Sequence, residues 1–312
     1  MPKIELYLGF LVLIAVLFVM VISFRIALSI YHPKRRSLLE TRAIVKEKWP
    51  AMMDAYDAWK LHSYEVFSPF DYRLRCYYLP AEDLRSRKLA IIAHGYTFTH
   101  HGAIKYAHMM HRLGYSVVFY DERFHGDSGG ANTTLGYYES RDLEAIIDDV
   151  TQRFGEGLEI GLVGESMGAV AAILSASRRQ TIRFVIADCP FADLEVLVTQ
   201  LVKRDYHLPK WPFVSMARIL FDGITGAKMR DVSPIIAVRT LTMPILFCHG
   251  KNDQFTLPDH SEALYLACRS PKRLYLAGND AGHADSFRNN PKEYFATVES
   301  FIKELVDERR GY

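Results

Sequence analysis

Runs of four to six mainly apolar residues recur along most of the chain, each separated from the next by a stretch of helical length. They occupy residues 89–93, 116–120, 158–163, 184–187, 244–248 and 273–276. Strands that are apolar along their whole length are buried on both faces, and helical connections between them are typical of parallel strands. The pattern therefore predicts an α/β fold, with a mostly parallel sheet and helices on both faces.

The remaining segments complete this organisation. Residues 63–67 and 73–79, separated by a short turn sequence, predict a β-hairpin at the start of a domain over residues 62–312. A polar segment at residues 37–61 predicts a helical linker before that domain. Helices are expected at residues 103–113, 137–154, 167–178, 259–267 and 291–306.

Residues 6–24 contain no charged side chain. A helix of this length rises roughly 28 Å, which is close to the thickness of the hydrocarbon core of a bilayer. The run is long for a signal peptide, Lys3 before it is offset by Glu5, and no small-x-small cleavage site follows. We therefore expect residues 1–36 to form an uncleaved, single-span membrane anchor with a basic flank.

The charge distribution predicts the orientation of this anchor. Arg25, Lys34, Arg35 and Arg36 follow the apolar run, whereas Lys3 alone precedes it. Basic flanks stay in the cytoplasm, so the body of the protein is expected on the cytoplasmic side of the cell membrane. The chain beyond residue 48 is slightly acidic, which argues against a nucleic-acid partner.

The spacing G-x-S-x-G occurs twice, at residues 164–168 and 126–130. Ser166 lies between an apolar strand and a helix rich in small residues, which is the context of a nucleophile elbow. Ser128 lies in GDSGG, which is similar to the serine segment of chymotrypsin-like proteases, but those proteins are all-β. We therefore expect Ser166 to be a nucleophile and Ser128 to belong to a structural loop.

Several segments together carry a family resemblance. They are His94-Gly95-Tyr96, the loop DERFHGDSG at residues 121–129, GESMG, HGKND at residues 249–253, and Gly282-His283. Over residues 62–308 the chain resembles the α/β-hydrolase superfamily, near its membrane-anchored, serine aminopeptidase-like and monoacylglycerol lipase-like members. Phe124 stands where such members carry a glycine. The resemblance implies an α/β-hydrolase fold with a small cap at about residues 191–240, whose apolar residues either pack onto the body or line an acyl pocket.

A serine nucleophile needs a base and an orienting acid, which follow it in the order Ser, Asp/Glu, His in this fold. His283 follows the last predicted strand and is the expected base. Asp253 follows the preceding strand and is the expected acid. Asp188 and Asp193 after the 184–187 strand remain alternatives, whereas Asp280 is too close in sequence to brace His283.

An oxyanion hole needs two backbone N–H groups. The residue after the nucleophile, Met167, supplies one, and the resemblance assigns the other to Tyr96. His94 is expected to be a structural residue at a strand end.

No cofactor or metal site is predicted. The four cysteines form no CxxC pair and are expected to be free thiols. His100, His101, His108 and His111 lack a carboxylate or cysteine that would complete a metal-ligand set. No nucleotide-binding glycine motif follows a strand.

These features predict a membrane-anchored serine hydrolase that cleaves small-molecule carboxylic esters through an acyl-enzyme. A thioesterase or an aminopeptidase would use the same three residues and remains an alternative. A non-catalytic binding protein on this fold usually lacks one of them, and none is missing here. The sequence does not indicate the oligomeric state.

Overall fold

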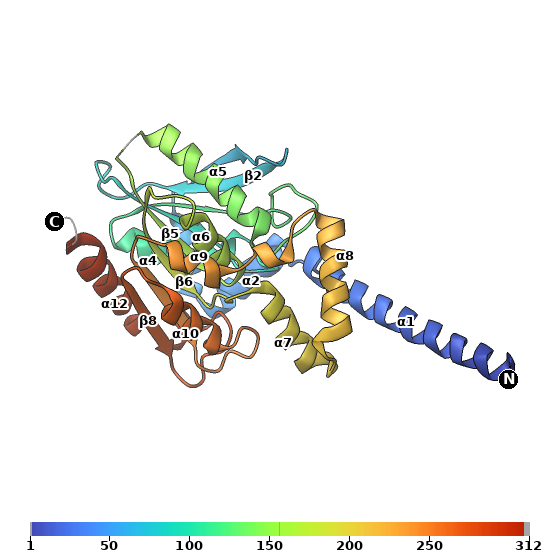
Figure 1. Ribbon diagram of the computed structural model, residues 1–312. Helices are drawn as coiled ribbons and strands as arrows, with labels where there is room; N and C mark the ends of the chain where they lie inside the picture. Colours follow the sequence, from blue (N-terminus) through green and yellow to red (C-terminus); the bar gives the residue numbers. More distant parts are fainter. Residues whose placement is uncertain (1, 156, 309–312) are drawn as a thin grey trace.

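A twisted sheet of eight strands forms the centre of the computed structural model, which describes residues 2–155 and 157–308 (Figure 1). The strand order is β1-β2-β4-β3-β5-β6-β7-β8. Strands β1 and β2 form the predicted antiparallel hairpin, β2 also pairs antiparallel with β4, and the other pairs are parallel. The strands are β1 (His62–Phe67), β2 (Arg73–Leu79), β3 (Lys88–Ala93), β4 (Ser116–Tyr120), β5 (Glu159–Glu165), β6 (Ile182–Asp188), β7 (Ile245–Gly250) and β8 (Lys272–Ala277).

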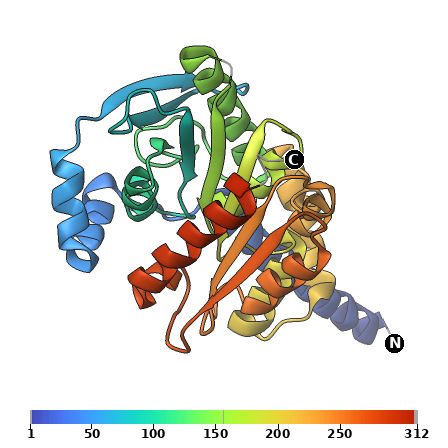
Figure 2. The same ribbon diagram turned by 90° about the vertical axis from the view of Figure 1, so that its left-hand side faces the viewer.

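Helices cover both faces of the sheet, as the apolar strands require (Figure 2). Alternate residues of each strand enter two separate cores: Ile91 and Leu162 pack in one, and Ile92 and Val163 pack in the other. The first core includes α5 (Tyr137–Phe154), α6 (Met167–Ala176) and α10 (Pro258–Ala267), and the second includes α4 (Ile104–Arg112) and α12 (Pro291–Phe301). The predicted mostly parallel α/β architecture is confirmed. The sequence pattern did not indicate the short α11 (Ser286–Asn289).

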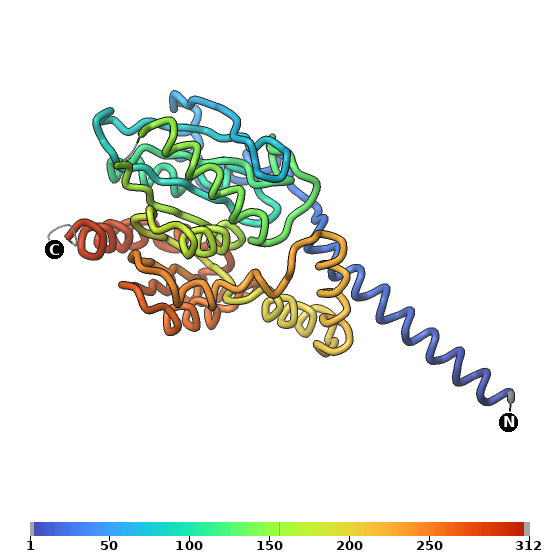
Figure 3. Tube along the Cα trace, turned by 45° about the horizontal axis from the view of Figure 1, so that its top comes forward, coloured from blue at the N-terminus to red at the C-terminus, as the bar shows by residue number. Residues whose placement is uncertain are grey.

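The segment predicted as a cap, residues 191–240, is helical and lies beside the N-terminal helix (Figure 3). It contains α7 (Leu194–Tyr206), α8 (Ser215–Thr225), α9 (Pro234–Ala237) and the short helical segments η2 (Lys210–Val214), η3 (Met229–Asp231) and η4 (Val238–Thr240). Phe221 and Met229 are buried in the first core, so part of this segment does pack onto the body.

Helix α1 (Pro2–Tyr31) projects from the body (Figure 1). Most of its apolar side chains are exposed. The stretch Lys3–Tyr31 is long and apolar enough to cross a membrane. Its last two turns differ, because Ile26, Ala27 and Ile30 are buried against the body. One end of this helix is therefore part of the folded domain.

The segment predicted as a helical linker forms two helices, α2 (Leu38–Lys48) and α3 (Pro50–Ala58). The break lies at Trp49 because Pro50 offers no N–H and disfavours helical backbone at the residue before it. Both helices pack on the domain, burying Val45 and Met53, and the hydroxyls of Thr41 and Thr99 lie 2.7 Å apart. The linker is thus docked against the body and does not act as a spacer.

Candidate active site

Ser166 lies at the sharp turn between β5 and α6, with the left-handed backbone angle φ of 54°. The glycines on either side make this turn possible. A Cβ on Gly164 would lie 2.3 Å from the carbonyl oxygen of Gly168, and one on Gly168 would lie 2.3 Å from that of Ala93. The Ser166 N–H donates to the carbonyl oxygen of Asp188, which fixes the turn to the neighbouring strand.

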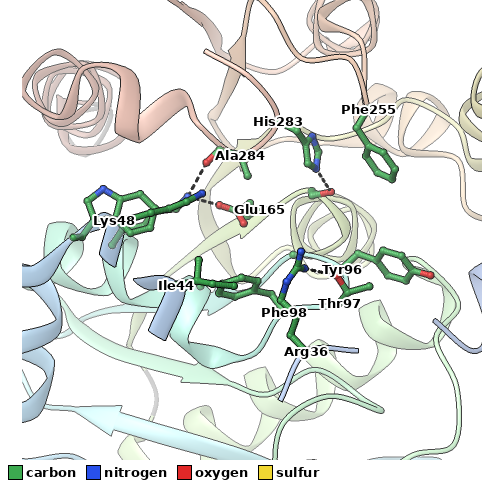
Figure 4. A pocket seen from close by; sticks show the side chains of 15 residues that line it. Arg36, Ile44, Lys48, Tyr96, Thr97, Phe98, Glu165, Phe255, His283 and Ala284 are labelled. Atoms are coloured by element: carbon green, nitrogen blue, oxygen red, sulfur yellow. Dashed lines mark hydrogen bonds and ion pairs between the residues drawn. The ribbon is translucent and has the colours of Figure 1, made fainter. Parts of the chain in front are cut away.

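Three predicted side chains meet at the carboxyl ends of β5, β7 and β8. His283, in the loop after β8, places its Nε2 3.0 Å from the Ser166 Oγ (Figure 4). Its Nδ1 lies 2.7 Å from the Asp253 Oδ2. With a carboxylate on one side and a hydroxyl on the other, a neutral imidazole donates from Nδ1 and accepts at Nε2. The ring of Phe255 packs 5.0 Å from the His283 ring, centre to centre.

The Asp253 carboxylate is buried and well supplied with hydrogen-bond donors. Backbone N–H groups of Phe255 and Thr256 donate to Oδ1, while the Thr256 hydroxyl and the His249 Nε2–H donate to Oδ2. Burial raises the pKa of Asp253, but the hydrogen bonds from His249 and His283 outweigh burial and hold this pKa well below its usual value. Asp253 therefore stays ionised.

The supporting roles of His249 and Thr256 were not predicted. His249 was noted only as part of the HGKND segment. Its Nδ1 lies 2.6 Å from the Ser261 Oγ, which fixes the ring beside Asp253. Thr256 lies three residues after Asp253, and its N–H donates to the Asp253 Oδ1. Aspartate side chains often accept such hydrogen bonds from nearby backbone, so this spacing could have indicated the role of Thr256.

The other acidic candidates have partners elsewhere. The Asp188 Oδ2 accepts hydrogen bonds from the phenols of Tyr106 and Tyr294. Asp193 caps the N-terminus of α7 by accepting from two of its backbone N–H groups. Asp280 accepts from the side-chain amide of Asn289. The structure thus brings Asp253, and none of these three, to the His283 ring.

Tyr96 and Met167 both border the serine. Met167 is the first residue of α6, where a backbone N–H has no acceptor within the helix. The Tyr96 loop is held by two buried histidines. His94 donates from Nδ1 to the Gly95 carbonyl oxygen and accepts at Nε2 from the Glu122 N–H, while His125 accepts from the Thr97 N–H. Burial lowers the pKa of His94 to about 3 and that of His125 to about 4, so both rings are neutral.

Ser128 occupies a loop and braces it. Its hydroxyl donates to the Asp121 carbonyl oxygen at 2.5 Å and accepts from the Arg75 N–H at 2.8 Å. The two G-x-S-x-G sequences therefore have different structural contexts, as predicted from their flanking residues.

Lys105 is a buried cation beside the serine turn that sequence reasoning missed. Its Nζ lies 2.5 Å from the Glu165 Oε2 and donates to the carbonyl oxygen of Ala284 at 3.0 Å. Burial lowers the pKa of Lys105, but the charges of Glu165 and Asp188 outweigh burial and leave this pKa raised. Lys105 therefore links the residue before Ser166 to the residue after His283.

Cys189, Asp253 and His283 offer possible metal-ligand atoms that lie within 4.8 Å of one another. Asp253 and His283 already hydrogen-bond to each other, and burial raises the pKa of the Cys189 thiol well above its usual value. A thiol that resists ionisation is a poor metal ligand, so this group does not fit a metal site.

Comparison with known proteins assigns the family. Residues 85–225 match the family described as serine aminopeptidase, S33. YqkD of Bacillus subtilis (strain 168) is 33% identical over 258 residues, which cover 82% of this chain and 84% of YqkD. The esterase Pf2001 of Pyrococcus furiosus superposes with a TM-score of 0.65 at 26% identity, covering 80% of this chain and 92% of the esterase. The chain belongs to the α/β-hydrolase superfamily.

The same fold occurs in solved structures that are less similar to this hydrolase in sequence. Est1E of Butyrivibrio proteoclasticus, solved with ferulic acid bound, superposes with a TM-score of 0.60 at 18% identity, covering 78% of this chain and 99% of Est1E. The predicted superfamily and fold class are confirmed, and the protein is a hydrolase.

Two cavities of this hydrolase meet at Ser166. The larger, of about 660 Å³, lies between α2, the Tyr96 loop and His283, and Arg36 and Lys48 reach its wall (Figure 4). The smaller, of about 280 Å³, is lined mainly by apolar side chains from α1 and α7, including Leu197 and Leu201 of the predicted cap. The cap segment therefore contributes both core residues and cavity walls.

Proposed function

We propose that this hydrolase cleaves carboxylic esters with Ser166 as the nucleophile. The observation that carries the proposal is the unbroken chain from the Ser166 Oγ through His283 to the buried Asp253, with separations of 3.0 and 2.7 Å. The Ser166 Oγ attacks the ester carbonyl carbon while His283 Nε2 takes the hydroxyl proton. Asp253 holds the tautomer and stabilises the imidazolium that forms.

The resulting oxyanion accepts hydrogen bonds from the backbone N–H groups of Tyr96 and Met167. The tetrahedral intermediate then collapses, and His283 donates its proton to the departing alcohol oxygen. A water molecule enters, gives a proton to His283 and attacks the acyl-enzyme carbonyl. Release of the carboxylic acid returns the proton to Ser166.

The lining of the cavities favours esters over aminopeptidase substrates. An aminopeptidase needs an unpaired carboxylate for the free α-ammonium group. Among the described residues that line the two cavities, the carboxylates are Glu165 and Asp205. Glu165 is paired with Lys105, and Asp205 with Arg204, each at 2.5 Å. The similarity to the esterase Pf2001 also supports this choice.

A substrate panel tests the proposal. The purified full chain is assayed with p-nitrophenyl butyrate, butyryl thioester and leucine p-nitroanilide. We expect the ester to give the highest kcat/KM, and Ser166→Ala to abolish its hydrolysis. Preferential cleavage of the anilide would assign an aminopeptidase, and preferential cleavage of the thioester would assign a thioesterase.

We further propose that α1 is a retained membrane anchor. Burial of Ile26, Ala27 and Ile30, together with a hydrogen bond from the Ser23 hydroxyl to the Phe213 carbonyl oxygen, supports retention, because cleavage would expose an apolar surface. The mass of the membrane-extracted protein should include residues 1–36, and salt washing should not release it. A mass lacking this segment would assign a signal sequence.

The basic flank of α1 supports a cytoplasmic position for the catalytic domain. Protease added to intact cells should therefore spare this domain, and should digest it after lysis. Digestion of the domain in intact cells would show that it lies on the outer side of the membrane.

A further inference from the structure

The smaller cavity beside Ser166 has one wall that is made by the N-terminal helix α1. Ile26, Ser29 and Ile30 of this helix face α7 across the cavity. The α7 side contributes four aliphatic residues, Leu197, Val198, Leu201 and Val202, and ends in Asp205 and Tyr206. A cavity of about 280 Å³ with such walls fits an extended hydrocarbon chain.

Hydrogen bonds from the body fix this part of α1 in place. The Tyr96 hydroxyl donates to the Ser29 carbonyl oxygen, and the Thr133 hydroxyl donates to that of Ile30. The Thr133 N–H donates to the Tyr31 carbonyl oxygen at 3.0 Å. These acceptors belong to the last turn of the helix, where carbonyl groups lack partners within the helix. The cavity wall is thus tied to the loop proposed to supply the oxyanion hole.

The cap segment reaches the uncharged run of α1. The Phe18 and Phe213 rings lie 6.0 Å apart, centre to centre, and the Ser23 hydroxyl donates to the Phe213 carbonyl oxygen. Phe18 and Ser23 both belong to residues 6–24, which we propose to span the membrane. The segment around Phe213 therefore lies at the level of the membrane boundary.

The exposed apolar side chains of the same segment support its position at the membrane boundary. Trp211 is 76% exposed and Ile219 is 55% exposed. Tryptophan is enriched where protein meets the membrane interface, and an apolar patch of this kind is stabilised by contact with lipid. Trp211 lies in η2 and Ile219 lies in α8, and both of these elements contact α1 (Figure 3).

The cavity begins just beyond the membrane run. From Phe24 to Ile26 and Ile30 the helix rises roughly 3 and 9 Å. The α1 wall of the cavity therefore starts next to the proposed membrane run, so an acyl chain that entered alongside α1 would cross little water. The larger cavity, with Arg36 and Lys48 at its wall, is left for the polar part of the substrate.

We propose that α1 is part of the substrate site as well as an anchor, and that the substrates are membrane-resident, single-chain acyl esters whose hydrocarbon chain binds between α1 and α7. This inference rests on the proposed serine esterase function. It adds the substrate class and the route by which the substrate arrives.

Substitutions on α1 test the inference in the detergent-solubilised full chain. Ile26→Trp and Ile30→Trp fill the cavity, whereas the matched control Leu28→Trp changes a side chain that is 39% exposed and does not line it. The readout is the ratio of kcat/KM for p-nitrophenyl octanoate to that for p-nitrophenyl acetate. We expect this ratio to fall about tenfold or more in the two cavity variants, and to stay at the wild-type value in Leu28→Trp.

A second variant covers the case in which a tryptophan variant does not fold. Ile30→Ala enlarges the cavity, so the ratio for dodecanoate over octanoate should rise. An unchanged chain-length profile in all the cavity variants, with normal hydrolysis by the wild type, would overturn the role of α1 and leave the esterase proposal intact. Absence of ester hydrolysis in the wild type would instead contradict the proposed function itself.

Discussion

The Lys105 Nζ lies 2.5 Å from the Glu165 Oε2, so the variable residue of the G-x-S-x-G turn is the partner of a buried cation on α4. The same Nζ donates to the Ala284 carbonyl oxygen, next to His283. Two loops that carry the proposed nucleophile and base are thereby connected through one side chain. Such a residue acts by positioning, because its charged group contacts Glu165 and the Ala284 carbonyl oxygen rather than the Ser166 hydroxyl or the His283 imidazole.

Replacing Lys105 with Met should destabilise the protein, because the buried Glu165 carboxylate loses its counter-charge. Breaking a buried ion pair from one side costs about 3–5 kcal/mol. The double variant Lys105→Met/Glu165→Gln should recover most of the stability in thermal melting. Its kcat should stay below the wild-type value, because the Ala284 carbonyl oxygen still lacks its donor. Full recovery of kcat would show that Lys105 serves stability alone.

Replacing Asp253 with Asn should lower kcat by roughly 10³–10⁴-fold, since an amide donor at this position favours the wrong tautomer of His283. The matched control is Asp280→Asn, which changes an acidic residue in the same region that hydrogen-bonds to Asn289. That control should retain near-normal turnover. Normal turnover in Asp253→Asn, together with loss of turnover in Asp188→Asn, would instead identify Asp188, at the end of β6, as the catalytic acid.

The depressed pKa of Asp253 predicts a pH-dependent contribution to stability. Because this pKa is lower in the folded protein than in the unfolded chain, the unfolded chain takes up the proton first as the pH falls. The stabilisation is therefore complete above the unfolded value of about 4 and is lost progressively below it. The melting-temperature difference between wild type and Asp253→Asn should be larger at neutral pH than at acidic pH. A difference that grows on acidification would contradict the assignment.

Much of the fold could be predicted because its signals are local. Apolar runs fixed the positions of the parallel strands, and glycines around Ser166 marked a turn whose close backbone contacts exclude a Cβ. His283 and Asp253 followed from their places after the last two strands, since parallel strands end at one edge of the sheet.

The remaining features depend on partners distant in sequence. The pairing of Lys105 with Glu165 requires the packing of α4 beside the serine turn, which no local pattern records. Docking of Ile26 and Ile30 likewise depends on surfaces formed by α7 and the Tyr96 loop. Hydropathy shows that the helix is apolar, but not which of its turns packs against the domain.

The most direct test of the account is the site of covalent labelling by a fluorophosphonate, which reacts with activated serine hydroxyls. The labelled full chain is digested, and the modified peptide is identified by mass spectrometry in the wild type, Ser166→Ala and Ser128→Ala. We expect modification of Ser166 in the wild type and in Ser128→Ala, and no modification in Ser166→Ala. Labelling that persists in Ser166→Ala and disappears in Ser128→Ala would contradict the proposal that Ser166 is the nucleophile.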